Sequence, residues 1–126
     1  MSDLNSWPQA AVQVNLLSSV SAANTAAATS AWVQTSNKEG TVAVVVNVGA
    51  VTGTLVLTLE DATDNSGTGG AGFTANEGAF SAATANTNHK RTFPARASRG
   101  FFRVVGTITT GPSLISASYL AHPKNV

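Results

Sequence analysis

Two stretches, Thr41-Val-Ala-Val-Val-Val-Asn-Val48 and Thr54-Leu-Val-Leu-Thr-Leu-Glu60, carry the strongest structural signal in the chain. The first is rich in β-branched residues and too short for a helix, which is typical of a strand buried on both faces. In the second, Leu55, Leu57 and Leu59 fall on one face and polar residues mostly on the other, the period of two of a strand. We expect the two stretches to pair as a hairpin across the glycine-flanked turn between them.

Further short segments with strand character occur on both sides of this pair. We expect strands near residues 12–16, 30–35, 89–95, 100–109 and 114–120. Residues 21–29 are rich in alanine but show no apolar stripe of helical period, so we interpret them as a polar connection. This spacing of short strands and turns predicts an all-β fold, a β-sandwich or barrel. The core residues that we expect are Val44, Val46, Leu55, Leu57, Leu59, Phe102, Val104 and Leu114.

The composition excludes several classes of protein. A length of 126 residues suits one domain, and 21 Ala, 13 Ser, 16 Thr and 11 Gly make the chain light. Only 10% of residues are charged, against roughly 25% in an ordinary soluble domain. The absence of cysteine excludes a disulfide scaffold and a cysteine-based metal site. The longest strongly apolar run, 42–46, is far too short to span a bilayer.

The beginning of the sequence does not look like a secretory signal. Met1-Ser2-Asp3 is acidic, and no apolar stretch follows it. We therefore expect synthesis in the cytoplasm and no membrane partner.

The formal net charge of +1 hides a polarity along the sequence. All six acidic residues lie within residues 1–77, where Lys38 is the one basic residue, so this part carries −5. The other six basic residues give residues 78–126 a charge of +6. Such asymmetry can signal nucleic-acid binding, or opposite charges that meet within the fold or between copies. Ordinary solvated charges remain the simplest interpretation.

No pattern indicates catalysis or a bound metal. The two histidines, His89 and His122, are far apart in the sequence, and there is no Gly-x-Ser-x-Gly nucleophile motif. Glu60, Asp61 and Asp64 offer carboxylates for calcium, but their order is not that of an EF-hand loop, and a polar turn explains them better. We expect no enzymatic activity, no cofactor and no metal.

A basic region in the last third raises nucleic-acid binding as an alternative. Arg91, Arg96, Arg99 and Arg103 are interleaved with phenylalanines, as in proteins that stack bases beside a cationic groove. The overall pI of about 8.2 is low for a dedicated nucleic-acid binder. We therefore expect the phenylalanines to lie in the core and the arginines to pair with carboxylates or partner surfaces.

The chain also resembles a family of tailed-bacteriophage capsid decoration (cement) proteins. The resemblance covers about two-thirds of the chain, from Thr41 to Lys124. Its motifs are Val44-Val-Val-Asn-Val-Gly-Ala-Val-Thr-Gly-Thr-Leu55, the following residues 56–67, Arg91-Thr-Phe93, residues 100–113 and Ala121-His-Pro-Lys124.

The resemblance implies a jelly-roll-like β-sandwich without catalytic residues. It implies a protein that binds the outer surface of the assembled icosahedral shell, with the major capsid protein as its partner. We expect an N-terminal arm at residues 1–11, a single domain at 12–126, and a homo-oligomer, dimer or trimer, on a symmetry axis. The expected partner contacts are Trp7, Pro8, Trp32, Arg91, Arg96 and Arg99. Connector and tail roles remain open, and the alternative function is a receptor- or glycan-binding module of a phage fibre or tail.

Overall fold

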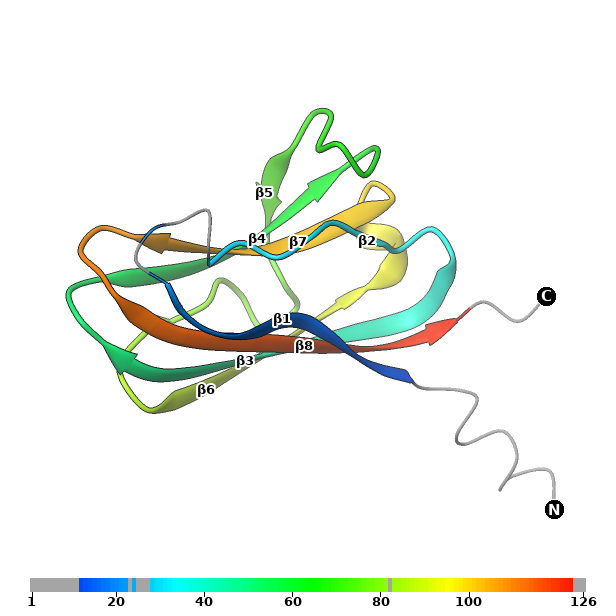
Figure 1. Cartoon of the computed structure of the whole chain (residues 1–126). Coiled ribbons are helices and arrows are strands. Elements are labelled where there is room, and N and C mark those ends of the chain that lie inside the picture. Colours follow the sequence, from blue (N-terminus) through cyan, green and yellow to red (C-terminus); the bar gives the residue numbers. More distant parts are fainter. Residues whose placement is uncertain (1–11, 23, 25–27, 82, 124–126) are drawn as a thin grey trace, which may run out of the picture.

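The chain folds as a β-sandwich of two four-stranded antiparallel sheets (Figure 1). The computed structural model describes residues 12–22, 24, 28–81 and 83–123. The elements in chain order are β1 (Val12–Ala22), β2 (Val33–Gln34), β3 (Lys38–Val51), β4 (Leu55–Ala62), β5 (Ala71–Phe73), β6 (Thr87–Pro94), the 3₁₀ turn η1 (Ala95–Ala97), β7 (Phe101–Ile108) and β8 (Ser113–Pro123). The predicted all-β sandwich is thus confirmed, whereas the expected N-terminal arm, residues 1–11, lies outside the described residues. The described residues contain no helix with the length and apolar character needed to cross a bilayer.

The strand order identifies the two edge strands of each sheet. The first sheet has the order β1-β8-β3-β6 and the second the order β2-β7-β4-β5. Strands β1 and β6 therefore border the first sheet, and β2 and β5 border the second. The segment between β5 and β6 carries the chain from one sheet to the other along one side of the sandwich (Figure 1).

The expected hairpin between residues 41–48 and 54–60 is wrong. Strand β3 pairs with β6 and β8, whereas β4 pairs with β5 and β7, so the two strands lie in different sheets. The turn between them crosses the sandwich at one end, where the Thr52 N–H donates to the Pro112 carbonyl at 3.0 Å. Gly53 fits this crossing because its φ is +80° and a Cβ there would lie 2.4 Å from Thr110.

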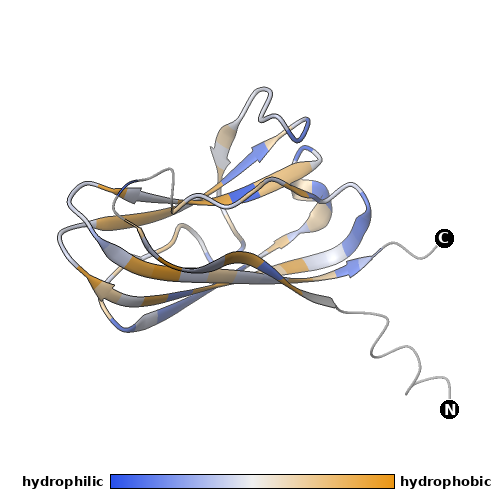
Figure 2. Cartoon of the chain, viewed as in Figure 1, coloured by the Kyte–Doolittle hydropathy of each residue, from blue (hydrophilic) through white to orange (hydrophobic). Residues whose placement is uncertain are grey.

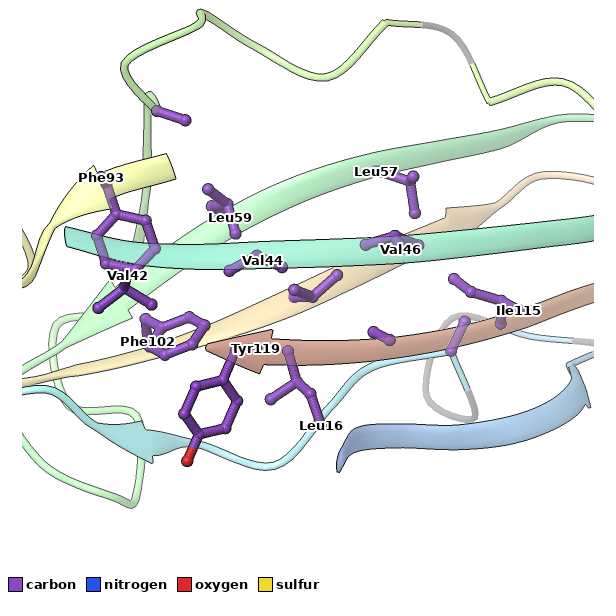
Figure 3. Packing of buried hydrophobic residues seen from close by; sticks show 14 of the residues in the cluster. Leu16, Val42, Val44, Val46, Leu57, Leu59, Phe93, Phe102, Ile115 and Tyr119 are labelled. Atoms are coloured by element: carbon purple, nitrogen blue, oxygen red, sulfur yellow. The ribbon is translucent and has the colours of Figure 1, made fainter. Parts of the chain in front are cut away.

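The core lies between the two sheets, as Figure 3 shows. Alternate residues of β3 point inward and are buried, and the leucines of β4 meet them from the second sheet. Three aromatic rings also span the layers. Phe102 makes edge-to-face contacts with Phe93 at 5.2 Å and with Tyr119 at 5.7 Å between ring centroids. Such pairs favour this offset geometry and add to the free energy gained from burial.

Strand β3 is not buried on both faces as expected. Its inward residues Val42 and Val44 are fully covered, while Ala43 and Val45 are half-buried and Asn47 is exposed. The β-branched run therefore reflects a central position in the sheet, with one face against the core and one face outside.

Leu114 does not belong to the core, contrary to expectation. It is 44% exposed, whereas the adjacent Ile115 is 1% exposed and lies opposite Val48 in the ladder. The strand begins on the buried Ser113, and this sets the alternation one residue away from the predicted phase. The other seven predicted core residues are buried: Val44, Val46, Leu55, Leu57, Leu59, Phe102 and Val104.

Candidate functional site

The first and last described strands bring their outer ends together. Val12 of β1 lies opposite Ala121, and Lys38 of β3 lies opposite Pro123. We call this part of the molecule the terminal end, because β1 begins and β8 ends there (Figure 1). Figure 2 shows hydrophilic residues gathered at the same end, in the turn before β3 and at the tip of β8.

Three surface hollows surround Lys38 at the terminal end. The largest, about 430 Å³, lies between residues 38–41 and 94–96. A second of about 310 Å³ continues on the other side of Ala95 and Arg96, towards Thr35 and residues 98–100. A third of about 160 Å³ opens beside Tyr119 and Pro123. Lys38 therefore lies at the centre of an uneven, indented surface.

The basic residues of the terminal end differ in how they are held. Arg96 is exposed on η1, and no ion pair involves it among the described residues. The ammonium of Lys38 donates to the Asn37 side-chain oxygen at 2.6 Å, and partial burial lowers its pKa. Glu39, which follows Lys38 directly in the sequence, is the acidic residue that lines the largest hollow. The arrangement leaves Arg96 available to an anionic group on a partner.

Arg99 is tied to the fold by Asp61. Its guanidinium Nη2 lies 2.8 Å from Asp61 Oδ1 and donates to the Gly69 carbonyl at 2.7 Å. This hydrogen bonding to Asp61 raises the pKa of Arg99. The side chain is still 44% exposed at the rim of the second hollow. Arg99 is thus held in place by Asp61, while the exposed part of its side chain remains accessible to a partner.

Trp32 forms a row with Arg103 and Glu60 on the outer face of the second sheet. The Arg103 guanidinium carbon lies 4.3 Å from the centre of the Trp32 ring, and Arg103 Nη2 lies 2.8 Å from Glu60. The loop after β4 packs on the same ring, since a Cβ at Gly67 would lie 3.1 Å from it. The ring is therefore partly enclosed by its own chain.

Arg91 lies away from the terminal-end group, on β6. Its guanidinium donates to the Ala79 carbonyl at 3.1 and 3.3 Å and lies 5.2 Å from the centre of the Phe80 ring. It therefore anchors the segment that leads into β6.

The structure brings together only part of the predicted contact set. Arg96 and Arg99 line one hollow, while Trp32 and Arg91 lie on other surfaces. Trp7 and Pro8 lie outside the described residues. Sequence reasoning overlooked Lys38, although its position as the one cation in the first 77 residues was a signal.

The three carboxylates considered for calcium have other roles. Glu60 and Asp61 pair with arginines, and Asp64 accepts from the Ser66 and Thr68 backbone N–H groups at 2.9 and 3.1 Å. These hydrogen bonds lower the pKa of Asp64, with the Thr68 hydroxyl as the largest cause. Within the described part of the chain, no three His, Asp or Glu side chains form a group able to hold a metal ion.

No protein-family model and no curated protein matches the sequence of this chain. Solved structures do match. The SPBc2 prophage-derived protein YomS has a TM-score of 0.52 at 12% identity, and the match covers 88% of this chain and 91% of YomS. A protein of the Bacillus endospore appendages, described as disulfide-linked pili, has a TM-score of 0.50 at 12% identity, with 92% and 90% covered.

The likeness is in the fold. It extends over nearly the whole length of both proteins, so the complete sandwich is shared rather than a fragment of it. A third structure, VP2 of an infectious bursal disease virus subviral particle, has a TM-score of 0.48 at 10% identity over 88% of this chain and 31% of VP2.

Proposed function

We propose that this protein is a non-enzymatic structural component of a phage-type virion, a decoration protein on the outside of the capsid shell. It binds the major capsid protein and stabilises contacts between shell subunits. The observation that carries the proposal is the terminal end, where Arg96 stands without an ion pair among the described residues beside hollows that share Lys38. The fold shared with a prophage-derived protein supports it.

The docking contact that we propose is electrostatic. An acidic loop of a shell subunit enters the hollows beside Arg96 and Lys38, and Arg99 contributes its exposed side at the rim. Ion pairs at an exposed surface are individually weak, about 0–1 kcal/mol. Their sum over many copies on a symmetric shell gives lasting attachment, because neighbouring contacts raise the effective concentration of one another.

A second surface suited to being covered lies on the outside of the first sheet. Its rows hold mostly small or mildly polar side chains together with the aliphatic Val45 and Leu120, and Lys90 is the one charged residue among the described members. We call it the small-residue face, formed by Ala43, Val45, Asn47, Asn88, Lys90, Thr92, Ser116, Ser118 and Leu120. Burying such a face removes few charges from water, which favours close packing against shell subunits or other copies.

The mechanism of stabilisation follows from selective binding. A protein that binds only the assembled shell shifts the equilibrium towards assembly by mass action. This chain contains no cysteine, so the assembly that we propose for it does not use disulfides, in contrast to the disulfide-linked pili. The glycan-binding alternative gains no support from Trp32, because Arg103 covers its ring.

The test begins with the neighbouring reading frames, among which the proposal expects a coat-protein gene, and continues with co-sedimentation with shells assembled from its product. We expect the protein to pellet with assembled shells, to stay in solution with free coat protein, and to raise the temperature at which shells disrupt. The variant Arg96→Glu should lose at least tenfold in shell affinity. The control Thr107→Glu adds a negative charge at an exposed site on β7, away from both proposed contact surfaces, and should bind nearly as the wild type does. Equal binding to free and assembled coat protein would refute the proposal.

A further inference from the structure

An apolar groove lies on the side of the sandwich where β5 and β6 form the margins. Its volume is about 240 Å³, and its largest lining side chains are Leu57, Leu59, Phe73 and Phe80. No charged residue lines it among the described positions. Small-molecule sites usually measure roughly 300–1,000 Å³. The groove is therefore of a size to hold one or two side chains of a peptide.

One wall of the groove is a strand edge that is open in its middle. Strand β5 pairs with β4 only from Leu59 to Asp61, and an isolated bridge joins Leu55 to Ala83. Between these points, residues 56–58 have ladder partners on β7 alone among the described residues. Unpaired backbone groups at a sheet edge are a template for another extended chain.

The opposite wall is held by the other sheet. The Asn76 N–H donates to the Thr92 carbonyl at 2.7 Å, and the Glu77 carboxylate accepts from the Thr92 N–H at 2.7 Å. Arg91 donates to the Ala79 carbonyl and covers the Phe80 ring. Because these contacts fix the wall to β6 rather than to β4, the groove is formed before anything enters it.

We propose that this groove receives residues 1–11 of a second copy of the chain, with Trp7 as the side chain that enters it. The segment precedes β1 and contains one charged residue, Asp3, so it suits a groove without charged lining. Pro8 favours an extended backbone at Trp7, as pairing with a strand edge requires. Eleven extended residues span up to roughly 36 Å, enough to reach a neighbouring molecule.

The direction of the contact follows from the strand order. The donated segment leaves from β1, at one margin of the first sheet, and the groove adjoins β6, at the other margin. Each copy thus donates its N-terminal segment from one side and binds the segment of another copy on the opposite side, which makes the interface head-to-tail. Such interfaces generate closed rings or open filaments rather than isolated two-fold dimers. The inference deepens the proposed assembly role by naming a second copy as the partner of the arm.

The experiment uses the full chain and no shell, so it fails or succeeds independently of shell binding. Sedimentation velocity over a range of concentrations compares the wild type with Trp7→Ala, which removes the anchor, and Thr74→Arg, which places a charge on the exposed rim of the groove. The control Thr107→Arg makes the same change at an exposed site on β7. A second groove variant, Ala79→Glu, replaces Thr74→Arg if the latter unfolds.

We expect self-association of the wild type and of Thr107→Arg, and at least tenfold weaker association of each of the other two variants. An equimolar mixture of Trp7→Ala and Thr74→Arg is decisive, because the first retains a groove and the second retains an arm. The mixture should form complexes that stop at two copies. A mixture that stays monomeric, a groove variant that associates as the wild type does, or a wild type that is monomeric at every concentration would overturn the inference.

Discussion

Arg99 closes the terminal end of the sandwich by binding Asp61 through both its backbone and its side chain. Its N–H donates to Asp61 Oδ2 at 3.1 Å, while Nε and Nη2 donate to Oδ1 at 3.1 and 2.8 Å. The Asp61 side chain is only 7% exposed. Its carboxylate is therefore satisfied by one residue from the connection before β7, and the acidic and basic parts of the chain meet inside the fold.

Replacing Asp61 should destabilise the protein. Asp61→Ala leaves the Arg99 donors without their carboxylate at a largely buried site, and we expect a loss of about 1–3 kcal/mol in the free energy of unfolding. Urea denaturation measures it. Arg96→Ala, which removes an exposed arginine at the same end, should shift the urea midpoint little. Equal shifts for the two variants would contradict a structural role for the ion pair.

The alternation along β8 predicts losses of stability of very different size for two adjacent residues. Ile115→Ala should cost about 2–5 kcal/mol, because it opens a cavity between the sheets. Leu114→Ala should cost less than about 1 kcal/mol, since Leu114 is 44% exposed and its removal opens no cavity between the sheets. Thermal or urea unfolding of both variants decides the point, and a larger loss for Leu114→Ala would mean that the strand has the opposite phase.

These residues show how far the sequence predicts the fold. The period of two in β4 and β7 identified their inward faces correctly, because side-chain direction depends only on local backbone geometry. The partner of each strand depends on where the chain turns. A glycine-flanked turn at residues 49–53 suits a hairpin and a crossing between sheets equally, and both bury the same alternate residues. Periodicity alone therefore could not separate them.

The terminal-end site was predictable only in part. The sequence singled out Arg96 and Arg99 as basic residues close together along the chain. Lys38 joins them because Thr41 of β3 lies opposite Pro94 at the end of β6, a register that no local pattern reveals. In the same way, the row of Trp32, Arg103 and Glu60 arises from the order β2-β7-β4, which brings distant residues into line.

Gly67→Ala should displace Trp32. The glycine has a φ of +86°, and an added Cβ would lie 3.1 Å from the indole ring. The left-handed conformation alone costs a non-glycine residue about 1–2 kcal/mol. In a Trp7→Phe background, where Trp32 is the remaining tryptophan, the emission maximum should shift to longer wavelength. Gly72→Ala, whose Cβ would meet its nearest neighbour at 3.7 Å, is the control and should leave the spectrum unchanged.

Stability should fall as the pH drops below about 6.5, because of His89. Burial, and next the charge of Arg91, lower the pKa of this residue from its ordinary value of 6.5. The unfolded chain therefore binds a proton before the folded protein does, and stability, complete above pH 6.5, is lost as the pH falls towards the folded-state pKa. Urea midpoints between pH 5 and 8 should show this slope.

Two variants test whether His89 causes the dependence of stability on pH. His89→Gln should flatten the dependence between pH 5 and 7, whereas His122→Gln should retain it. The hydrogen-bonded carboxylates Asp64 and Glu77 have lowered pKa values, so their contribution is lost only at lower pH, below their ordinary values of 3.8 and 4.5. A slope that survives His89→Gln would assign the effect to other groups.

Salt should weaken the binding of this protein to assembled shells if the terminal end is the docking surface. The Debye length falls from about 10 Å at 0.1 M salt to about 3 Å at 1 M, so the attraction of Arg96 and Lys38 for acidic groups is screened. Arg96→Gln should reduce the salt dependence as well as the affinity. Docking through the small-residue face predicts the reverse, because it buries little charge and sulfate strengthens the burial of apolar surface. Co-sedimentation in sodium chloride and in sodium sulfate separates the two surfaces. If binding becomes tighter in sulfate and does not change with chloride, the small-residue face rather than the terminal end is the docking surface.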